Sequence, residues 1–548
     1  MLKRIFSLFS RRRRRQAAWI AVTVFIRSLL DFVGVAALVP VIFLIARHLG
    51  SDRRIILLLC CAVMLFVMLK DVAVYFLVKV QTKFQTDLFR DFSRRMFVNY
   101  YRRGMMFLKS ESSARLAYQV NGIAMIFSQS IMGALLSLAG EIVLVACLSV
   151  ALVIWKPAMG GIIFAIFVPA AFAYSLAVKK KIKALGDSSL KAQRAQSRNV
   201  IETFRGYAEL EIAGAFSTSL NSFDSNLSQI TKNRITLDLY RLMPSFISEV
   251  GFIGGLMALV AFAGDDPLFT AGVFAMAAFK IIPSVRGALN NWATIQNHSS
   301  AIDIVEQGVR ENNDACYDSD VPPLPFARGL VANRLGFSYP DGKVLFRNLS
   351  FTISPGERIG IKGRSGAGKS TLFNLLLGFF RPTEGEILID DQPLRGENRR
   401  AWHNTLGYVP QEIFIIDGSL AQNIALGDEN IDRDKVMHIL SQVQLREWAE
   451  ALPEGIDTNL GEYGSRLSGG QKQRIGIARA LYKGATVLFF DEATSSLDSA
   501  TEKEINRALK QLSDTHSELT MIIIAHRESS LQFCSRIINL DEYNDNEI

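Results

Sequence analysis

A glycine-rich motif followed by two further motifs constrains the fold of this chain more than any other feature. The residues GRSGAGKS at 363–370 have the spacing G-x-x-x-x-G-K-S, in which backbone N–H groups close around phosphate oxygens. The lysine places a positive charge near the β- and γ-phosphates, and a helix that begins in the loop adds the positive end of its dipole. LSGGQ follows at 467–471 and VLFFDE at 487–492. This order predicts a nucleotide-binding domain.

The residues predicted to hold the phosphates lie in this glycine-rich loop. Lys369 supplies the charge, and the hydroxyl of Ser370 can bind Mg²⁺. From residue 330 onward, short β-rich runs alternate with helical ones, which predicts an α/β domain with a mainly parallel sheet. The predicted cofactor-binding residues of the loop are Gly363, Arg364, Ser365, Gly366, Ala367, Gly368, Lys369, Ser370 and Thr371.

The first half of the chain has a different character. Long apolar runs fill residues 17–295, whereas residues 326–548 have the composition of an ordinary globular domain. Hydrophobic residues make up 49% of the chain and the mean hydropathy is +0.20, which is high for a soluble enzyme. A helix that crosses a bilayer needs about 20 apolar residues. We therefore expect six membrane-spanning helices, near 17–46, 55–80, 120–154, 158–178, 240–264 and 267–288.

The charge pattern predicts the orientation of this all-α membrane domain. The formal net charge is +9, and basic residues gather at the N-terminus and in the long segments after the second and fourth spans. This is a positive-inside bias, so we expect contact with membrane lipid and no nucleic-acid partner. An even number of spans places both termini in the cytoplasm. The polar stretch 311–325 contains three prolines and is the predicted linker between domains at 1–310 and 326–548.

The motifs over residues 326–548 resemble the nucleotide-binding domain of ABC transporters, and the order of the two domains resembles their exporter-type half-transporters. The resemblance implies ATP and Mg²⁺ as cofactors. Tyr339 in GFSYP is at the position that stacks on adenine. Gln411 in YVPQEIF is at the position of the glutamine that senses Mg²⁺ and the γ-phosphate.

The resemblance also implies roles for three residues near the end of the chain. Asp491 corresponds to the aspartate associated with Mg²⁺, and Glu492 to the carboxylate that polarises the attacking water. His526 corresponds to the histidine that contacts the γ-phosphate. The chemistry agrees, because phosphoryl transfer depends on positioning and charge neutralisation. We therefore expect ATP hydrolysis, with Gln411, Glu492 and His526 as catalytic residues and Ser370, Gln411 and Asp491 at the metal.

LSGGQ resembles the signature of the family, in which Ser468 and Gly470 contact the γ-phosphate bound by the other subunit. Gly469 and Gln471 belong to the same turn, and Asp498 lies in the loop that crosses the dimer seam. One nucleotide domain then cannot complete a site. We expect a second half-transporter subunit as partner, with a homodimer as the simplest assembly and a heterodimer as the alternative.

The membrane half is similar, in DFVGVAALVPVIFLI, NYYRRGMMFLKSESSARL and KIIPSVRG, to flippases that move lipid-linked oligosaccharides in bacterial protein N-glycosylation. This resemblance implies a multi-pass protein of the bacterial inner membrane with its ATPase domain in the cytoplasm. In ABC exporters, short coupling helices dock on the ATPase domains. We expect them near 104–110 and 211–218.

Charged side chains inside the predicted spans bear on the substrate, because charges at membrane depth are costly and point to function. Lys280, Arg286 and Arg241 would form a cationic cavity wall, which suits a pyrophosphate or carboxylate headgroup better than a cationic drug. Arg27 is a fourth candidate. The alternative is structural: Arg27 can pair with Asp31 four residues later, and Arg241 can extend toward the interface.

The favoured interpretation is ATP-driven export or flipping, by alternating access, of an amphiphilic anionic substrate such as a lipid-linked oligosaccharide. A second transporter class, exporters of peptides or drugs, fits the same motifs. A third possibility is a non-transporting regulatory membrane ATPase, or a soluble ABC ATPase that binds nucleic acid. The apolar spans argue against the soluble form.

Overall fold

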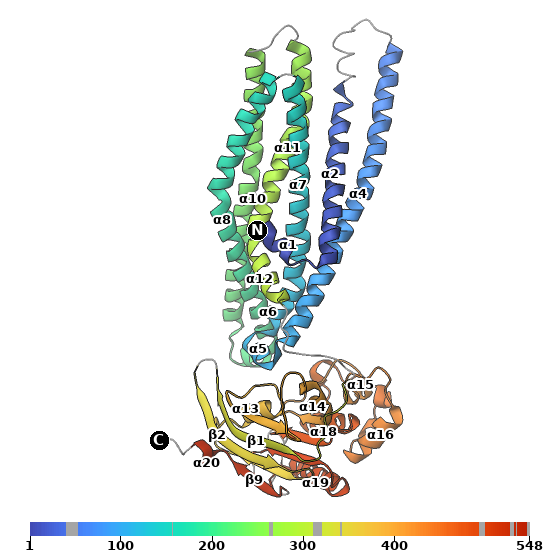
Figure 1. Cartoon of the computed structure of the whole chain (residues 1–548), viewed down its shortest axis with the longest axis vertical. Helices are drawn as coiled ribbons and strands as arrows, with labels where there is room; N and C mark the ends of the chain where they lie inside the picture. Colours follow the sequence, from blue (N-terminus) through green and yellow to red (C-terminus); the bar gives the residue numbers. More distant parts are fainter. Residues whose placement is uncertain are drawn as a thin grey trace. The chain divides into compact units, whose positions relative to one another are not determined.

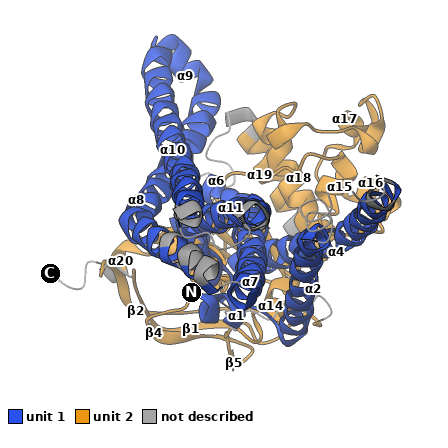
Figure 2. Cartoon of the chain, turned by 90° about the horizontal axis from the view of Figure 1, so that it is seen from above, with its two compact units in different colours: residues 1–102, 108–311 blue, residues 103–107, 312–548 orange. Residues whose placement is uncertain are grey.

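A computed structural model divides the chain into two compact units. The first consists of residues 1–102 and 108–311, and the second of residues 103–107 and 312–548 (Figure 2). The structure describes residues 1–39, 53–155, 157–261, 267–310, 321–339, 342–492, 499–525, 531–532 and 534–544.

The first unit is built of helices, and the long ones lie side by side (Figure 1). Two π-helical segments precede α7, and the second of them leads directly into it. In chain order its elements are α1 (Leu2–Ser7), α2 (Arg11–Ala36), α4 (Arg53–Arg102), α6 (Ser113–Tyr118), η1 (Gln119–Ile123), η2 (Ile126–Ile131), α7 (Met132–Trp155), α8 (Pro157–Arg205), α9 (Tyr207–Ile212), α10 (Phe216–Ala261), α11 (Pro267–Asn297) and α12 (Ser299–Val309). The short helix α5 (Gly104–Ser110) is divided, with residues 104–107 in the second unit and 108–110 in the first.

Three helical stretches in the described part of the chain are long and apolar enough to cross a bilayer: Arg11–Ala36, Leu57–Arg102 and Ser113–Trp155. They overlap the first three predicted spans, although α2 ends at Ala36 and residues 40–46 lie outside the described residues. The other three predicted spans fall on α8, α10 and α11, except that residues 262–264 lie outside the described residues. Large apolar side chains on this unit are turned outward, for example Ile154 and Phe279, which are 79% and 82% exposed. Such exposure suits contact with lipid.

The long charged segments after the second and fourth predicted spans continue the same helices. The 50 residues of α4 correspond to about 75 Å at 1.5 Å per residue, more than twice the ~30 Å hydrocarbon core. The short helix α5 coincides with the coupling helix expected at 104–110. The expectation of a second one at 211–218 is wrong by about one turn, because Gly214 has a φ of +60° and separates α9 from α10.

A proline inside α10 shows how this unit satisfies the hydrogen-bonding groups of its backbone. Pro244 has no N–H, so the carbonyl of Tyr240, one turn earlier, receives no hydrogen bond from within the helix. The hydroxyl of Tyr174 on α8 donates to that carbonyl at 2.9 Å. A neighbouring helix thus supplies the missing donor, as an apolar surrounding requires.

We expect Tyr174→Phe to destabilise the first unit by about 1–3 kcal/mol, the usual cost of leaving a buried carbonyl unsatisfied. The matched control is Tyr75→Phe, because the Tyr75 side chain is 64% exposed on α4. The measurement is the thermal unfolding midpoint of the detergent-solubilised protein. Equal midpoints for the two variants would contradict the role given to the Tyr174 hydroxyl.

The second unit contains two sheets. One is antiparallel, with the strand order β2-β1-β4-β5, and the other is parallel, with the order β6-β7-β8-β3-β9. The strands are β1 (Leu330–Ser338), β2 (Val344–Ile353), β3 (Arg358–Lys362), β4 (Glu384–Ile389), β5 (Gln392–Pro393), β6 (Leu406–Val409), β7 (Val487–Asp491), β8 (Thr520–Ile524) and β9 (Arg536–Asn539). This confirms the prediction of an α/β unit with a mainly parallel sheet.

The helices of this unit pack around the two sheets. The α-helices are α13 (Lys369–Leu376), α14 (Arg399–Thr405), α15 (Leu420–Ile424), α16 (Arg433–Gln442), α17 (Arg446–Glu450), α18 (Gly469–Tyr482), α19 (Ser499–Thr515) and α20 (Asp541–Asn544), and two 3₁₀ turns lie at η3 (Gly455–Asp457) and η4 (Glu462–Gly464). The central strands β7 and β8 are buried on both faces, because Val487 to Phe490 are at most 1% exposed and Met521 to Ile524 at most 4%. A continuous apolar run is typical of such strands. The rigid centre of the sheet therefore positions the loops at its carboxyl end.

Candidate nucleotide-binding site

The phosphate loop joins β3 to α13 at the carboxyl end of the parallel sheet. Gly366 and Gly368 have φ values of +83° and +94°, a conformation in which a side chain is strained. A Cβ on Gly368 would also come within 3.3 Å of the Phe346 ring. Because α13 begins directly after Gly368, its first N–H groups open toward the loop, which is an arrangement that binds phosphate.

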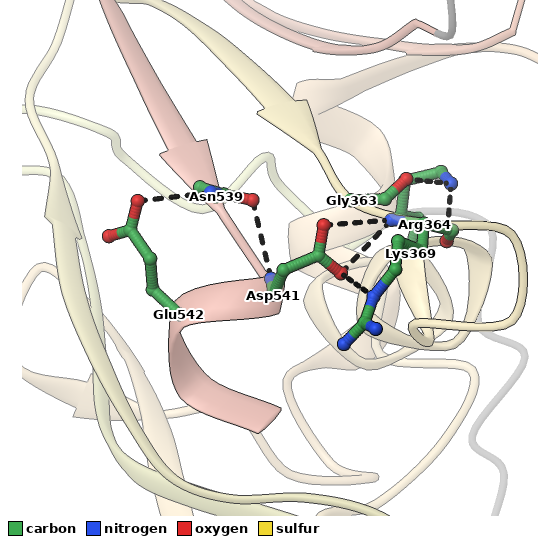
Figure 3. Close-up of polar contacts among 6 residues, drawn as sticks. All are labelled: Gly363, Arg364, Lys369, Asn539, Asp541 and Glu542. Carbon is green, nitrogen blue, oxygen red and sulfur yellow. Dashed lines mark hydrogen bonds and ion pairs between the residues drawn. The ribbon is translucent and has the colours of Figure 1, made fainter. Parts of the chain in front are cut away.

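Lys369 is held by the backbone of its own loop (Figure 3). The residue is 6% exposed, and its Nζ donates to the carbonyl oxygens of Gly363 at 2.8 Å and Arg364 at 3.1 Å. An ammonium group has three N–H donors. Two are used within the loop, which leaves one that can reach a phosphate oxygen.

Tyr339 lies beside the loop. Its hydroxyl is 2.9 Å from the Thr371 hydroxyl, and its ring meets that of Phe337 edge to face at a centroid distance of 5.1 Å. The structure therefore brings two predicted nucleotide-binding residues, Tyr339 and Thr371, into contact. Adenine stacking by the Tyr339 ring stays a prediction.

Glu492 follows the last residue of β7, and Gln411 lies next to it. The Gln411 Nε2 donates to the Glu492 Oε2 at 3.1 Å. Glu492 has a φ of +50°, which is uncommon for a residue with a side chain, and its N–H donates to the Ile524 carbonyl at 3.0 Å. The backbone of β8 thus fixes an unusual conformation, and that conformation aims the carboxylate at the glutamine predicted to share the site.

Asp491, one residue earlier, contacts Tyr408 on β6. The Tyr408 hydroxyl donates to the Asp491 Oδ2 across a long 3.5 Å contact. Burial, reinforced by the adjacent Asp491 charge, raises the pKa of Tyr408 far above its ordinary value. Tyr408 therefore remains a hydrogen-bond donor at any physiological pH, and it holds one side of the carboxylate in place.

The residues predicted to bind Mg²⁺ fit that ion chemically. A hydroxyl from Ser370, an amide oxygen from Gln411 and a carboxylate from Asp491 form the all-oxygen donor set that Mg²⁺ prefers. Ser370 is exposed in the loop. Gln411 turns its amide nitrogen toward Glu492, which directs the amide oxygen elsewhere. When bound, the ion would neutralise charge on the phosphates.

The LSGGQ motif forms the start of α18. Ser468 is the N-cap residue, and its hydroxyl accepts from the Gln471 N–H at 3.2 Å. In return the Gln471 side chain accepts from the Ser468 N–H at 2.8 Å. This capping box fixes the backbone of Gly469 and Gly470. The helix packs on β6, which two other strands separate from β3 and the phosphate loop.

Two predicted site residues cannot be placed. His526 and Asp498 lie outside the described residues. The structure adds one residue that the sequence analysis did not single out: Asp541, the second residue after β9 and the first of α20, contacts the phosphate loop through Arg364 (Figure 3). The sequence does show an acidic residue at the end of a short, partly apolar run, INLD. It does not show which strand lies beside that run, so the contact with the phosphate loop could not be predicted.

Two of the candidate substrate-binding residues, Lys280 and Arg241, belong to separate groups of charged residues instead of one wall. Lys70 Nζ lies 3.1 Å from Asp31 Oδ1 and 2.9 Å from Asp71 Oδ1, and Lys280 Nζ lies 4.0 Å from Asp31 Oδ1. Helices α2, α4 and α11 therefore meet at Asp31. Within the described residues the ion-pair partners of Asp31 are these two lysines, and not Arg27, the partner in the structural alternative.

Arg241 belongs to the second group. Its Nη2 donates to the Thr294 hydroxyl at 3.0 Å, and its Nη1 lies 3.7 Å from Asp238. Thr294 is about 21 Å further along α11 than Lys280 at 1.5 Å per residue, so Arg241 and Lys280 do not meet. Arg286 lies between these levels on α11 and is exposed, whereas Arg27 is half-buried on α2.

Comparisons with known proteins agree with this geometry. Residues 346–495 match the family model described as ABC transporter. An ATP-dependent lipid A-core flippase from Coxiella burnetii is 31% identical over 480 residues, which cover 83% of this chain and 78% of that protein. The chain belongs to the ABC transporter family. The match with the Coxiella protein decides this, because it extends well beyond the nucleotide-binding unit.

Other relatives match this ABC transporter over a smaller part of their length. The ATP-dependent lipid A-core flippase from Alkalilimnicola ehrlichii is 34% identical over 348 residues, 62% of this chain. The chain spans 58% of the length of that protein. Among solved structures, a bacterial Atm1-family ABC exporter with ATP bound has a TM-score of 0.82 at 23% identity, and covers 96% of this chain and 94% of its own. The ABC exporter fold is thereby established over nearly the whole transporter.

Proposed function

We propose that this chain is one half of an ATP-driven flippase or exporter for an anionic amphiphile, with a lipid-linked saccharide as the substrate class. The observation that carries the proposal is the combination of two parts in one chain. One part has apolar helices long enough to cross a bilayer. The other has a phosphate loop whose backbone holds Lys369, and a Gln411 side chain hydrogen-bonded to Glu492. The relatives named as lipid A-core flippases support the substrate class. The location that follows is the inner membrane of a bacterium, with the ATPase unit and both termini in the cytoplasm.

Within the ATPase unit, different residues have different roles in ATP hydrolysis. Lys369 and the N-terminus of α13 bind the phosphates. Ser370, Gln411 and Asp491 would hold Mg²⁺, which would supply further positive charge. Glu492 orients the attacking water as a general base. Gln411 fixes the Glu492 side chain by its 3.1 Å hydrogen bond. Gln411 would therefore contact both the metal and the general base.

A second copy completes each site in this proposal. Ser468 and Gly470 of one subunit would contact the γ-phosphate held by the loop of the other. The strand order supports this, because α18 packs at the β6 edge of the sheet, away from β3. The N-terminus of a 14-residue helix with two glycines in its first turn offers N–H groups to an anion arriving from outside.

The hairpin of α8 and α10 provides the route from ATP binding to the membrane helices. Figure 2 shows α9 at the end of this hairpin, at one edge of the first unit. Among its exposed residues, three large apolar side chains face outward: Phe204, Tyr207 and Ile212 are 76%, 66% and 89% exposed. Large exposed apolar residues gathered at one tip point to a docking surface. We assign it to the ATPase unit of the second copy, as the coupling contact.

The headgroup of the substrate is expected to meet Lys280 first. Its Nζ is 4.0 Å from Asp31, whose nearer partner is Lys70 at 3.1 Å. Lys280 is therefore the cation of this group whose charge is compensated least, and it is 33% exposed. Arg286 lies six residues further along α11, and Arg241 and Arg27 lie at other levels of the bundle. These four residues are the proposed substrate-binding residues.

Reconstitution in liposomes tests the proposal. We expect a polyprenyl-pyrophosphate saccharide to stimulate ATP hydrolysis several-fold, and a cationic dye to leave it unchanged. Lys280→Gln should raise the concentration needed for half-maximal stimulation about tenfold, the loss of one charge-assisted contact. The matched control is Lys232→Gln, an exposed lysine on α10.

The outcomes separate the competing functions. Stimulation by the dye alone would indicate a drug exporter and contradict the anionic substrate. Hydrolysis that no amphiphile or peptide stimulates would indicate a regulatory ATPase. An equal effect of the Lys280 and Lys232 substitutions would remove Lys280 from the binding site.

A further inference from the structure

We infer that Asp541 is a positioning residue for Lys369 and acts through the peptide group that joins Gly363 to Arg364. The inference rests on the proposed ATP hydrolysis and adds to it a residue from the last helix of the chain. Figure 3 shows the three participants in a row, with the loop between the aspartate and the lysine.

Asp541 reaches the loop because of the strand order. β9 pairs with β3 in parallel, with Lys362 opposite Asn539, and the Leu540 N–H donates to the Lys362 carbonyl at 2.9 Å. Both strands end at the same edge of the sheet. The chain after β3 turns into the phosphate loop, and the chain after β9 turns into α20, so Asp541 and Arg364 become neighbours although 177 positions separate them.

The contact between them is made to the backbone. Both carboxylate oxygens of Asp541 accept from the Arg364 N–H, each at 3.0 Å. The carbonyl of the same peptide group is that of Gly363, and it accepts from Lys369 Nζ at 2.8 Å. One peptide plane is therefore held between an anion on its N–H side and a cation on its C=O side.

This arrangement fixes the direction of the peptide plane. Hydrogen bonds to charged groups are stronger than neutral ones, and bonds in a chain polarise each other in the same sense. Rotation of the plane would break both bonds together and point the Gly363 carbonyl away from the lysine. Lys369 would then lose one of the two acceptors that hold its ammonium at the start of the loop.

Neighbouring residues hold Asp541 in place, and a nearby positive charge offsets its negative charge close to the phosphate site. A Cβ on Gly363 would lie 3.3 Å from the Cβ of Leu540, so the two chain segments are in close contact. Asn539 accepts from the Asp541 N–H at 3.3 Å and donates to Glu542 at 3.0 Å. The Arg364 Nε lies 3.3 Å from the carboxylate, and its positive charge offsets the anion close to a phosphate site.

The test is a double-mutant cycle on nucleotide binding by the full chain in nanodiscs, read with a fluorescent ATP analogue. We expect Asp541→Ala to weaken binding about tenfold in the wild-type background. In the Lys369→Ala background it should weaken binding less than twofold, because residues that act through one another are not additive. Asp541→Asn, which keeps an oxygen acceptor but loses the charge, should fall in between at about threefold.

The matched control is Asp514→Ala. Asp514 pairs at 3.5 Å with Arg358, at the opposite end of the same strand β3, so its loss tests a general effect on the strand. We expect less than a twofold change in binding. If Asp541→Ala does not fold, Asp541→Asn is measured in the same two backgrounds.

Each outcome decides the inference. Weaker binding of the analogue in the wild-type background, with little change in the Lys369→Ala background, supports it. An equal loss in both backgrounds would reduce Asp541 to a residue that stabilises the fold, and no loss in either would remove it from the site. Failure of the unmodified chain to bind the analogue would contradict the proposed function, and this inference with it.

Discussion

Glu492→Gln is expected to lower ATP turnover by a factor of at least about 100 while ATP binding is retained. General acid–base catalysis contributes about 10²- to 10⁴-fold to a rate, and glutamine cannot take a proton from water. The substitution preserves the size of the side chain and an oxygen that can accept from Gln411, which lies 3.1 Å from the carboxylate. ATP should therefore bind and remain unhydrolysed. Phosphate release measures turnover, and the nucleotide that stays with the purified protein measures trapping.

The matched control is Glu386→Gln, an exposed glutamate on β4 of the same unit. It makes the same chemical change away from the parallel sheet, so turnover should stay within a factor of two. Normal turnover of the Glu492 variant would show that another group activates the water. Loss of binding together with turnover would instead indicate that the carboxylate supports the loop structure.

Ser468→Ala is expected to have the second-largest effect, a loss of turnover of about 10- to 100-fold. If the Ser468 hydroxyl reaches the γ-phosphate bound by a second copy, its removal takes away a hydrogen bond to a charged group, which contributes about 1.5–3 kcal/mol. The same hydroxyl also caps α18, and loss of a cap costs about 1 kcal/mol of stability. The two effects must be separated.

The chain itself offers the control. Ser419 caps α15 with the same reciprocal capping box, through Gln422. Ser419→Ala should destabilise the unit as much as Ser468→Ala but leave turnover within a factor of two. Cross-linking between Ser365→Cys and Ser468→Cys in two copies, with ATP present, measures the contact directly. Equal turnover in the two alanine variants, or no cross-link between subunits, would contradict the shared site.

The sequence predicts local features of the site well, because they depend on residues close together in the chain. Gly366 and Gly368 occupy left-handed conformations that favour glycine, and Ser468 followed by Gln471 forms a capping box. The apolar run 487–490 becomes a central strand that delivers Asp491 and Glu492. In each case a conformational preference or a hydrophobic period is legible within a few residues.

Contacts between distant segments were not predictable in the same way. Arg27 and Asp31 share a helix face, yet Asp31 pairs with lysines on two other helices, because packing decides which cation comes nearest. Arg241 on α10 and Lys280 on α11 do not form the predicted cationic wall, because Arg241 contacts α11 at Thr294, 14 residues beyond Lys280. The position of α9 was missed by about one turn, since the left-handed Gly214, and not the hydrophobic pattern, ends the helix.

The nucleotide-binding α/β unit and the apolar helices of bilayer length were predictable from the residues alone, because motif spacing and hydrophobic periodicity are properties of neighbouring residues. The folded structure was needed to show that β9 lies beside β3, and hence that Asp541 meets the phosphate loop. It also decided that the Tyr174 hydroxyl fills the place of the N–H that Pro244 lacks. Both contacts depend on which elements become neighbours, and that depends on the packing of the whole unit.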